Sequence, residues 1–308
     1  MSAMAAGQQV VPGWETLTWS GTLTAVSSIA HGGENRGTIT LLRREVMVTS
    51  EGLLLHVPVI SGNTLRGRLR RIGEELLRDA LDYEGLLPAA VAHVLRGGGA
   101  LAKTGREPVS GAQLGRLRML VPQVAVFGGA GGGTIINGAL DVGKVVPQVA
   151  ETQPITGVAS GMSSFTLTQL ESYTRQDDGQ AHDFPAVAGG GQEVSQARLA
   201  FDEQGRPKPV VSGSAQMLFH IETFPAGTVF STWLRLRRPT LIEVSFLSEV
   251  LEVFSRQGRL GGRVAVGHGQ VRADLVPDRP VDAGALPDWS AMVRAHRGEI
   301  LELLACLG

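Results

Sequence analysis

The segment ISGNTLRGRLR, residues 60–70, opens the most regular part of the chain. Ser61 is a residue type that caps helices by accepting a hydrogen bond from a backbone N–H of the first turn, and Asn63 is the alternative cap. Apolar residues then recur at three- and four-residue spacing from Leu65 to Leu77, which places them on one face of a helix. The pattern predicts an amphipathic helix over residues 61–81 with one buried face.

The same segment is dense in arginine. Four guanidiniums fall within six residues near the expected start of the helix, at Arg66, Arg68, Arg70 and Arg71. The helix dipole is already positive there, and free backbone N–H groups at a helix start bind anions. Glu74 and Glu75 can pair with Arg70 and Arg71, as on an ordinary solvated helix face, but Arg66 and Arg68 have no acid beside them. The cluster favours a phosphate-binding site.

Patterns on either side of this helix indicate an α+β protein. Alternating, β-branched segments predict strands, and a second amphipathic pattern predicts a helix over residues 240–256. The expected strands cover residues 16–29, 38–48, 52–59, 212–236 and 261–275, and a last helix covers 289–307. Residues 31–37 are expected to form a loop. Residues 152–198 are polar and Gly-rich, which predicts a protruding loop or hairpin. The order of elements is that of a ferredoxin-like core with large insertions.

Composition narrows the classes of function. The 308-residue chain carries a net charge of −1, so its overall charge does not indicate a nucleic-acid partner. Only a local cluster of cations could indicate one. Gly is enriched, with 41 residues, which favours tight turns and close backbone approaches. Aromatic residues make up 5%, which argues against a surface built on base stacking. The single Cys306 excludes an internal disulfide and a cysteine zinc site.

Several sites that the sequence superficially suggests lack required residues. The G-x-x-x-x-G-K match at residues 138–144 has Val145 where a P-loop needs Ser or Thr. The glycine run at residues 128–133 fails dinucleotide spacing, and a flexible turn explains it. His31 and His268 lie beside glycines, without the neighbouring ligands of a metal site, so we expect a surface or RNA-contacting role for each. No metal and no cofactor are expected.

The sequence shows no basic segment followed by an apolar one at its start, and no run of about 18 apolar residues. We therefore expect no signal peptide, no membrane span and a cytoplasmic location.

Five segments in order resemble the backbone subunits of class 1 CRISPR effector complexes, the RAMP superfamily. Residues 60–70 are similar to the pattern I-P-G-x-S-L-[KR]-G-x-L-R, with Ser61 in place of Pro. The other four segments are SIAHGG (28–33), VFGG (126–129), IETFPAGTVF (221–230) and GGRVAVGHGQV (261–271). No single match is specific, but five in the right order are. The chain looks most like the type IV branch.

The resemblance implies a ferredoxin-like, RRM-like palm forming one domain over residues 1–308. It also implies a helical insertion at about residues 83–122 and a β-hairpin thumb at about 168–209. The implied function is to bind guide (CRISPR) RNA and to oligomerise along it as a head-to-tail filament. The implied partners are the guide, further copies of the chain, other effector subunits, and a target nucleic acid paired to the guide.

The resemblance also assigns roles to residues that match its motifs. Asn63, Thr64, Arg66 and Arg70 would hold RNA phosphates, and Gly267 to Gly269 would let the RNA backbone approach. The full expected RNA-binding set is His31, Arg36, Ser61, Asn63, Thr64, Arg66, Arg68, Arg70, Gly267 and His268.

One departure from the family pattern bears on catalysis. Relatives that cut target RNA carry an Asp in the loop after the first strand, whereas residues 34–38 contain only Glu34 as an acid. Arg36 can pair with that carboxylate or compete for phosphate. We therefore expect no enzymatic activity. The alternative is a metal-dependent target-RNA endoribonuclease of the same family, and a third reading is a scaffold in which the arginines only pack a subunit interface.

Overall fold

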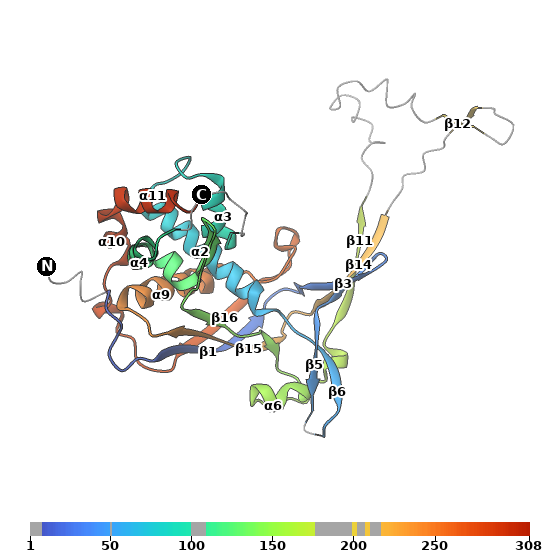
Figure 1. Ribbon diagram of the computed structural model, residues 1–308. Helices are drawn as coiled ribbons and strands as arrows, with labels where there is room; N and C mark the ends of the chain where they lie inside the picture. The colour runs from blue at the N-terminus through green and yellow to red at the C-terminus, as the bar shows by residue number, and fades with distance from the viewer. Residues whose placement is uncertain (1–7, 50, 100–108, 176–198, 202–206, 210–216) are drawn as a thin grey trace.

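A computed structural model describes residues 8–49, 51–99, 109–175, 199–201, 207–209 and 217–308 of the chain (Figure 1). The described part is a mixed α+β fold, as the sequence predicts. None of its helices is both long and apolar enough to cross a bilayer.

The main sheet is antiparallel and has β1 (Thr16–Ala25) near its centre. β1 pairs on one side with β15 (Val229–Arg237) and on the other with β16 (Val271–Pro277). β10 (Val146–Pro147) and β9 (Leu140–Val142) pair with the far edge of β15. The chain passes through a helix between β1 and β9 and again between β15 and β16. Each connection therefore skips one strand, giving two interleaved strand–helix–strand units.

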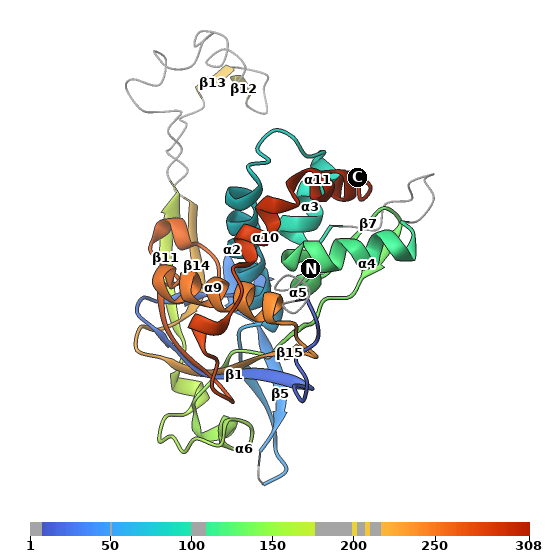
Figure 2. The ribbon, with the colours of Figure 1, turned by 90° about the vertical axis from the view of Figure 1, so that its left-hand side faces the viewer.

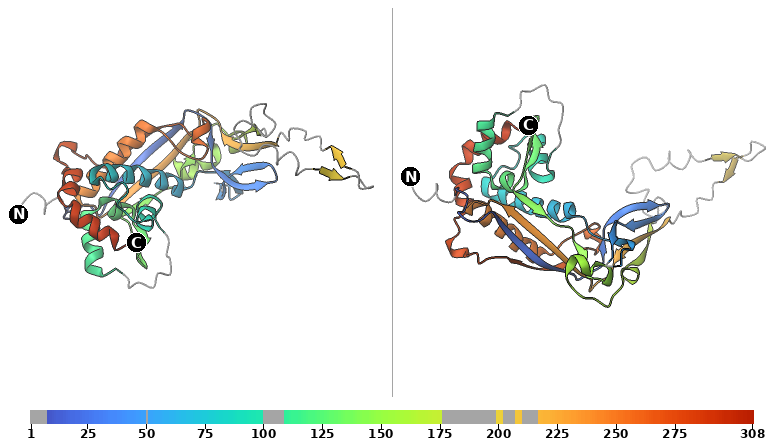
Figure 3. Two further views of the ribbon diagram at one scale, coloured as in Figure 1. Left: turned by 90° about the horizontal axis from the view of Figure 1, so that it is seen from above. Right: turned by 60° about the horizontal axis from the view of Figure 1, so that its bottom comes forward.

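Helices cover one face of this sheet. α2 (Gly62–Leu81) begins at the Ser61 cap, as predicted, and α9 (Leu241–Gln257), also predicted as a helix, begins at a Thr240–Glu243 capping box. Figures 1 and 3 show the helices gathered on a single side of β1, β15 and β16. The remaining long helices are α3 (Ala89–Gly97), α4 (Gly111–Leu120), α5 (Pro122–Phe127), α10 (Trp289–Ala295) and α11 (Arg297–Ala305).

Strand alternation assigns the two faces of the main sheet. On β1, Leu17, Trp19 and Leu23 are buried against the helices, while Thr18, Ser20 and Thr22 on the opposite face are partly buried or exposed. Phe230 and Leu234 of β15 continue the buried face. The face away from the helices thus carries Thr and Ser in place of a second core.

A second sheet projects from this body. β11 (Gln169–Arg175) pairs antiparallel with β14 (Met217–Phe224), and β14 runs parallel to β4 (Ile39–Leu42). β3 (Gly32–Arg36) pairs with β4, and β2 (Ile29–Ala30) with β14. Figures 1 and 2 show β11 and β14 as a strand pair rising away from the helices.

Short strand pairs and turns complete the described part. β5 (Arg44–Val48) and β6 (Leu54–Pro58) form a separate hairpin, and β12 (Leu199–Phe201) pairs with β13 (Pro207–Pro209). β7 (Gly129–Gly131) and β8 (Thr134–Ile136) form a third pair, and α6 (Gln153–Thr156) is a single helical turn.

The structure corrects three expectations. Residues 31–37 form strand β3 and a turn at Gly37, whose φ is +60°, because they pair with β4. The last helix is divided at His296, because its Nδ1 contacts the Met292 carbonyl (2.9 Å) while its backbone N–H donates to Val293. Most of the expected strand over residues 261–275 is loop, and β16 begins only at Val271. The expected hairpin at 168–209 lies largely outside the described residues, which omit 176–198, 202–206 and 210–216; within them β11 pairs with β14.

Candidate nucleic-acid interface

The start of α2 is held by a cap and by close backbone packing. The Ser61 hydroxyl accepts a hydrogen bond from the Asn63 N–H (3.2 Å), and the Ser61 N–H donates to Nε2 of His31 (3.1 Å). A Cβ on Gly62 would lie 2.8 Å from the carbonyl oxygens of Val142 and Gly143, so only glycine fits there. Asn63 is exposed and Thr64 is half-buried beside it. The hydrogen bonds of His31 and Ser61 thus fix the position of the first turn of α2.

His31 is neutral in this arrangement. Burial lowers the pKa of its imidazole, and the nearby Arg43 guanidinium lowers it further. Nε2 accepts the Ser61 N–H and therefore carries no proton. The sequence predicted an RNA-contacting His31, and the structure places its ring under the helix start instead.

Arg66 and Arg70 point into the protein. Arg66 donates to the carbonyl oxygens of Phe127 (2.8 Å) and Leu140, and Arg70 donates to those of Gly128 (2.8 Å) and Phe127. Arg70 is only 8% exposed, and burial, followed by the charge of Arg66, lowers its pKa to about 10. The two arginines therefore hold the end of α5, and we correct the expectation that they face phosphates.

The reason lies in helix geometry. Residues four apart share a helix face, and at Arg66 and Arg70 that face packs against the end of α5 and β9. Carbonyl oxygens satisfy the guanidinium donors there, which offsets the cost of burying the charge. The expected pairing of Glu74 and Glu75 with Arg70 and Arg71 is also absent. Arg96 lies 2.6 Å from Glu74 and 3.9 Å from Glu75 instead.

The other two arginines of the cluster line a groove on the outside of α2. This groove, which we call the α2 groove, has a volume of about 390 Å³ and lies between α2 and the loop that follows α9. Its lining residues are Asn63, Thr64, Gly67, Arg68, Arg71, Arg259, Leu260, Gly261 and Val264. Three of the expected RNA-binding residues therefore come together in it, namely Asn63, Thr64 and Arg68.

Positive charge is concentrated in the α2 groove without full compensation. Burial lowers the pKa of Arg68; Glu75 partly opposes this, and the charges of Arg259 and Arg71 lower it further. Arg68 donates to Oε1 of Gln257, yet its Nε is buried with no hydrogen-bond partner in the described residues. Neither Arg71 nor Arg259 forms an ion pair with a described carboxylate, and both are exposed. Such a set of donors suits an anion.

Sequence reasoning missed Arg259 and assigned Arg71 to an acid partner. Arg259 stands two residues before the Gly261–Gly262 pair, directly after the αL turn at Gly258 that ends α9. The sequence feature that could have indicated a role for Arg259 is a cation close to a glycine pair.

The loop behind Arg259 depends on glycine. A Cβ on Gly269 would lie 2.3 Å from the Leu260 carbonyl oxygen, and its φ is +79°. Gly267 has a φ of +96° and open space around it, and it is exposed. His268 between them is 4% exposed, with Nδ1 2.9 Å from the Ser28 hydroxyl and Nε2 bonded to the Tyr173 hydroxyl. The expected surface role therefore fits Gly267 and not His268.

Glu34 and Arg36 lie on β3 and face each other. Arg36 donates from Nε to Oε1 of Glu34 (3.0 Å), and both side chains are more than half exposed. The hydrogen bond from Arg36, with its charge, lowers the pKa of Glu34. Arg36, Arg43, Arg44 and His56 line a polar hollow of about 690 Å³ beside this pair. Among the described residues, no group of three or more His, Cys, Asp or Glu side chains could hold a metal ion.

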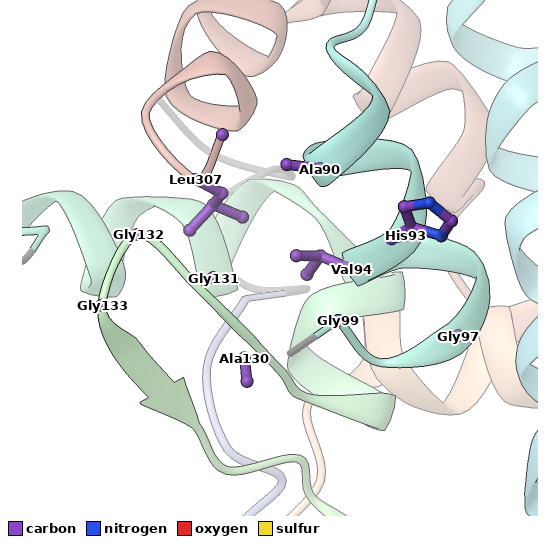
Figure 4. A pocket seen from close by; sticks show the side chains of 11 residues that line it. Ala90, His93, Val94, Gly97, Gly99, Ala130, Gly131, Gly132, Gly133 and Leu307 are labelled. Carbon is purple, nitrogen blue, oxygen red and sulfur yellow. The ribbon is translucent and has the colours of Figure 1, made fainter. Parts of the chain in front are cut away.

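The glycine run at residues 128–133 is a packing device. A Cβ on Gly131 would lie 2.8 Å from Val94 and 3.0 Å from the Leu307 carbonyl oxygen, so β7 passes close to α3 and α11. Figure 4 shows Val94 and Leu307 facing this strand across an apolar pocket of about 400 Å³. Gly132 and Gly133, with φ of +54° and +71°, form the turn between β7 and β8, so the expected turn is present within an ordered strand pair.

Comparison with known proteins gives one clear relationship. No model of a known protein family matches the chain, and no curated protein matches it significantly. A chain in a solved structure described as "Type IV-B CRISPR Complex" is 29% identical, with a TM-score of 0.58. The similarity covers 89% of this chain and 96% of that one. The protein therefore belongs among the subunits of type IV CRISPR complexes.

Proposed function

We propose that this chain is the guide-RNA-binding backbone subunit of its complex, and that it binds RNA through phosphates and does not cut it. The strand order β10-β15-β1-β16, with α2 and α9 on one face, supports a ferredoxin-like, RRM-like palm in this proposal. The projecting β11–β14 pair is the base of the thumb in this proposal. Other subunits of the complex are its protein partners.

The observation that carries this proposal is the α2 groove. Arg68, Arg71 and Arg259 converge there, and the buried Nε of Arg68 has no partner among the described residues. Guanidiniums bind phosphate oxygens through paired hydrogen bonds, and bringing an anion into the groove relieves the mutual repulsion of the three cations. The groove lies beside the N-terminal turn of α2, which adds a positive dipole.

The composition of the groove favours backbone contacts over base reading. Apart from the arginines, it offers Asn63 and Thr64 side chains and a wall of glycine and aliphatic residues. No aromatic side chain lines it. Phosphate contacts carry no base information, so the expected affinity for unstructured RNA is independent of sequence and falls with salt.

The test replaces Arg71 and Arg259 together by Gln, because both are exposed and have no ion pair to lose. Affinity for unrelated single-stranded RNAs should fall to a similar extent for each sequence, measured by anisotropy across a salt series. The slope of log K against log salt should shrink by about 1.4, since each phosphate contact to a single strand contributes roughly 0.7.

The matched control is Arg294→Gln, an exposed arginine on α10 that should change neither affinity nor slope. An unchanged slope in the double variant, or a loss restricted to one RNA sequence, would refute phosphate binding at this groove. Absence of RNA from purified protein, with no binding in titration, would favour the scaffold reading.

The endoribonuclease alternative depends on Glu34. Metal-assisted hydrolysis needs a carboxylate placed to hold the ion beside the scissile phosphate. The Arg36 guanidinium already occupies both carboxylate oxygens of Glu34, at 3.0 and 3.4 Å. We therefore expect no cleavage of guide-complementary RNA with Mg²⁺ or Mn²⁺, and Glu34→Ala should leave RNA binding intact. Cleavage that disappears in this variant would establish the alternative.

A further inference from the structure

The outer face of the main sheet, away from the helices, carries polar side chains in a regular row. Along β1 this row consists of Thr16, Thr18, Ser20, Thr22 and Thr24. Register pairing places Ser20 beside Trp233 and Thr22 beside Ser231 on β15, and Thr24 beside Arg272 on β16. Figures 1 and 3 show that, of the α-helices in the described part of the chain, only the short α6 lies on this side of the sheet.

A groove of about 700 Å³ crosses this face at Trp233. Its floor is formed by hydroxyl groups of Ser20, Thr22 and Ser231, with Gln148 donating to the Ser231 hydroxyl (3.0 Å). Ile155 and Val158, both exposed, form an aliphatic wall. The groove therefore combines a flat polar floor with one apolar side.

Trp233 forms a platform with Arg235. The Arg235 guanidinium lies 5.0 Å from the centre of the Trp233 ring, and the indole remains 39% exposed. The Gly143 backbone packs against the ring, since a Cβ there would lie 2.6 Å from its Nε1. Glycine at that position allows the indole to lie flat along the chain.

The charge left available on the outer face is positive. Arg237 is neutralised by Asp141 (3.2 Å), and Lys144 by Glu45. Arg235 and Arg272 form no ion pair with a carboxylate in the described part of the chain, although Asp274 lies on the same face. Two guanidiniums are therefore free to meet an anionic partner.

We propose that this outer face is a second binding site, for single-stranded nucleic acid, in which a base stacks on the Trp233–Arg235 platform. Phosphates then meet Arg272, and the hydroxyl row hydrogen-bonds bases or sugars. Protein interfaces also use Trp and Arg, but their cores are apolar, whereas the row of hydroxyl groups on β1 with two arginines that have no described carboxylate partner favours a polyanion. Single strands are bound by aromatic stacking within a positive groove. The site is independent of the α2 groove, which lies on the helix-covered side.

The experiment uses the full chain with Arg71 and Arg259 both replaced by Gln, so that the α2 groove contributes little. Oligo(U) and oligo(dT) are titrated separately while tryptophan fluorescence and the anisotropy of a labelled oligonucleotide are followed. Trp19 and Trp289 are buried, so stacking on Trp233 should dominate any quenching. Trp233→Ala should weaken binding about tenfold, because stacking contributes roughly 1–3 kcal/mol per base.

Arg235→Gln should weaken binding too, and Trp14→Phe is the control that keeps the site and removes another partly buried indole. Equal affinities for oligo(U) and oligo(dT) mean that the site does not distinguish ribose from deoxyribose. A higher affinity for one of them identifies the bound strand as RNA or DNA. Binding of the oligonucleotide through the α2 groove of the unsubstituted chain, with no quenching of tryptophan fluorescence, would overturn this inference and leave the proposed function standing. Loss of subunit assembly in Trp233→Ala, with oligonucleotide binding unchanged, would also overturn it and make the face a protein contact.

Discussion

Arg70 and Arg71 are adjacent in the chain, yet their side chains lie in opposite environments. Arg70→Ala should lower the free energy of unfolding by about 2 kcal/mol, because the Gly128 carbonyl loses its side-chain donor and an unsatisfied buried group costs roughly 1–3 kcal/mol, while the Phe127 carbonyl keeps the donor from Arg66. Arg71→Ala should change stability by less than about 0.5 kcal/mol and weaken RNA binding. Urea unfolding and RNA anisotropy on both variants check this. Equal effects of the two substitutions on stability would contradict the assignment.

The two arginines also show the limit of sequence reasoning at this scale. The segment around Arg66 to Arg71 predicts a helix start with a phosphate site; the helix start is confirmed, and Arg68 lies in the α2 groove. Which members turn inward depends on where the end of α5 lies, and that contact is about sixty residues distant in the chain. No local pattern contains this information.

His31 should make stability depend on pH below neutrality. Its folded pKa lies below the ordinary value of 6.5, so the unfolded chain binds the proton first. The contribution of neutral His31 to the stability of the fold is complete above pH 6.5, and it is lost as the pH falls from 6.5 towards the folded pKa. His31→Gln keeps an acceptor for the Ser61 N–H and does not titrate. Urea unfolding at pH 7.5 and 5.5 should show a larger loss in the wild type than in this variant, and equal losses would contradict a neutral, buried His31.

At the scale of elements, periodicity predicted α2 with its Ser61 cap and the helix α9, and alternation predicted β1, β14 and β15. Each has a long, regular pattern with one buried face, so its local signal and its tertiary environment agree. β3 was missed because its five residues are exposed and polar, and only pairing with β4 makes them extended. The glycine loop at residues 261–270 was taken for a strand because its alternating Val and Gly imitate one.

Two glycines of that loop should respond differently to alanine. Gly269→Ala brings a Cβ to 2.3 Å from the Leu260 carbonyl oxygen at a φ of +79°, so the loop must shift, and a loss of roughly 2 kcal/mol or more is expected. Gly267→Ala has only the strain of a φ of +96°, about 1 kcal/mol. If RNA approaches at Gly267, that milder variant should nevertheless lose RNA affinity. Thermal unfolding and RNA titration of both variants decide this, and a Gly267→Ala protein with wild-type affinity would remove Gly267 from the interface.

At the scale of the whole molecule, the β11–β14 pair projects away from the helices and the main sheet (Figure 1). It carries exposed apolar side chains, with Leu170 58% and Leu218 49% exposed. A contact made by such a projection with the body of another copy is heterologous, and heterologous contacts extend into open arrays unless they close into a ring. The proposed coating of a guide RNA by many copies depends on this geometry.

Replacing Leu170 and Leu218 together by Ser tests this, because both side chains are exposed on the projecting β11–β14 pair. The variant should stay folded and keep its RNA affinity per subunit, since the α2 groove is untouched. On a long unstructured RNA it should bind as separate subunits instead of a continuous array, as seen by light scattering and negative-stain microscopy. The Arg71 and Arg259 double variant is the converse control, impaired in RNA binding with the projection unchanged. Continuous arrays formed by the Leu170 and Leu218 variant would place the contact between copies elsewhere on the body.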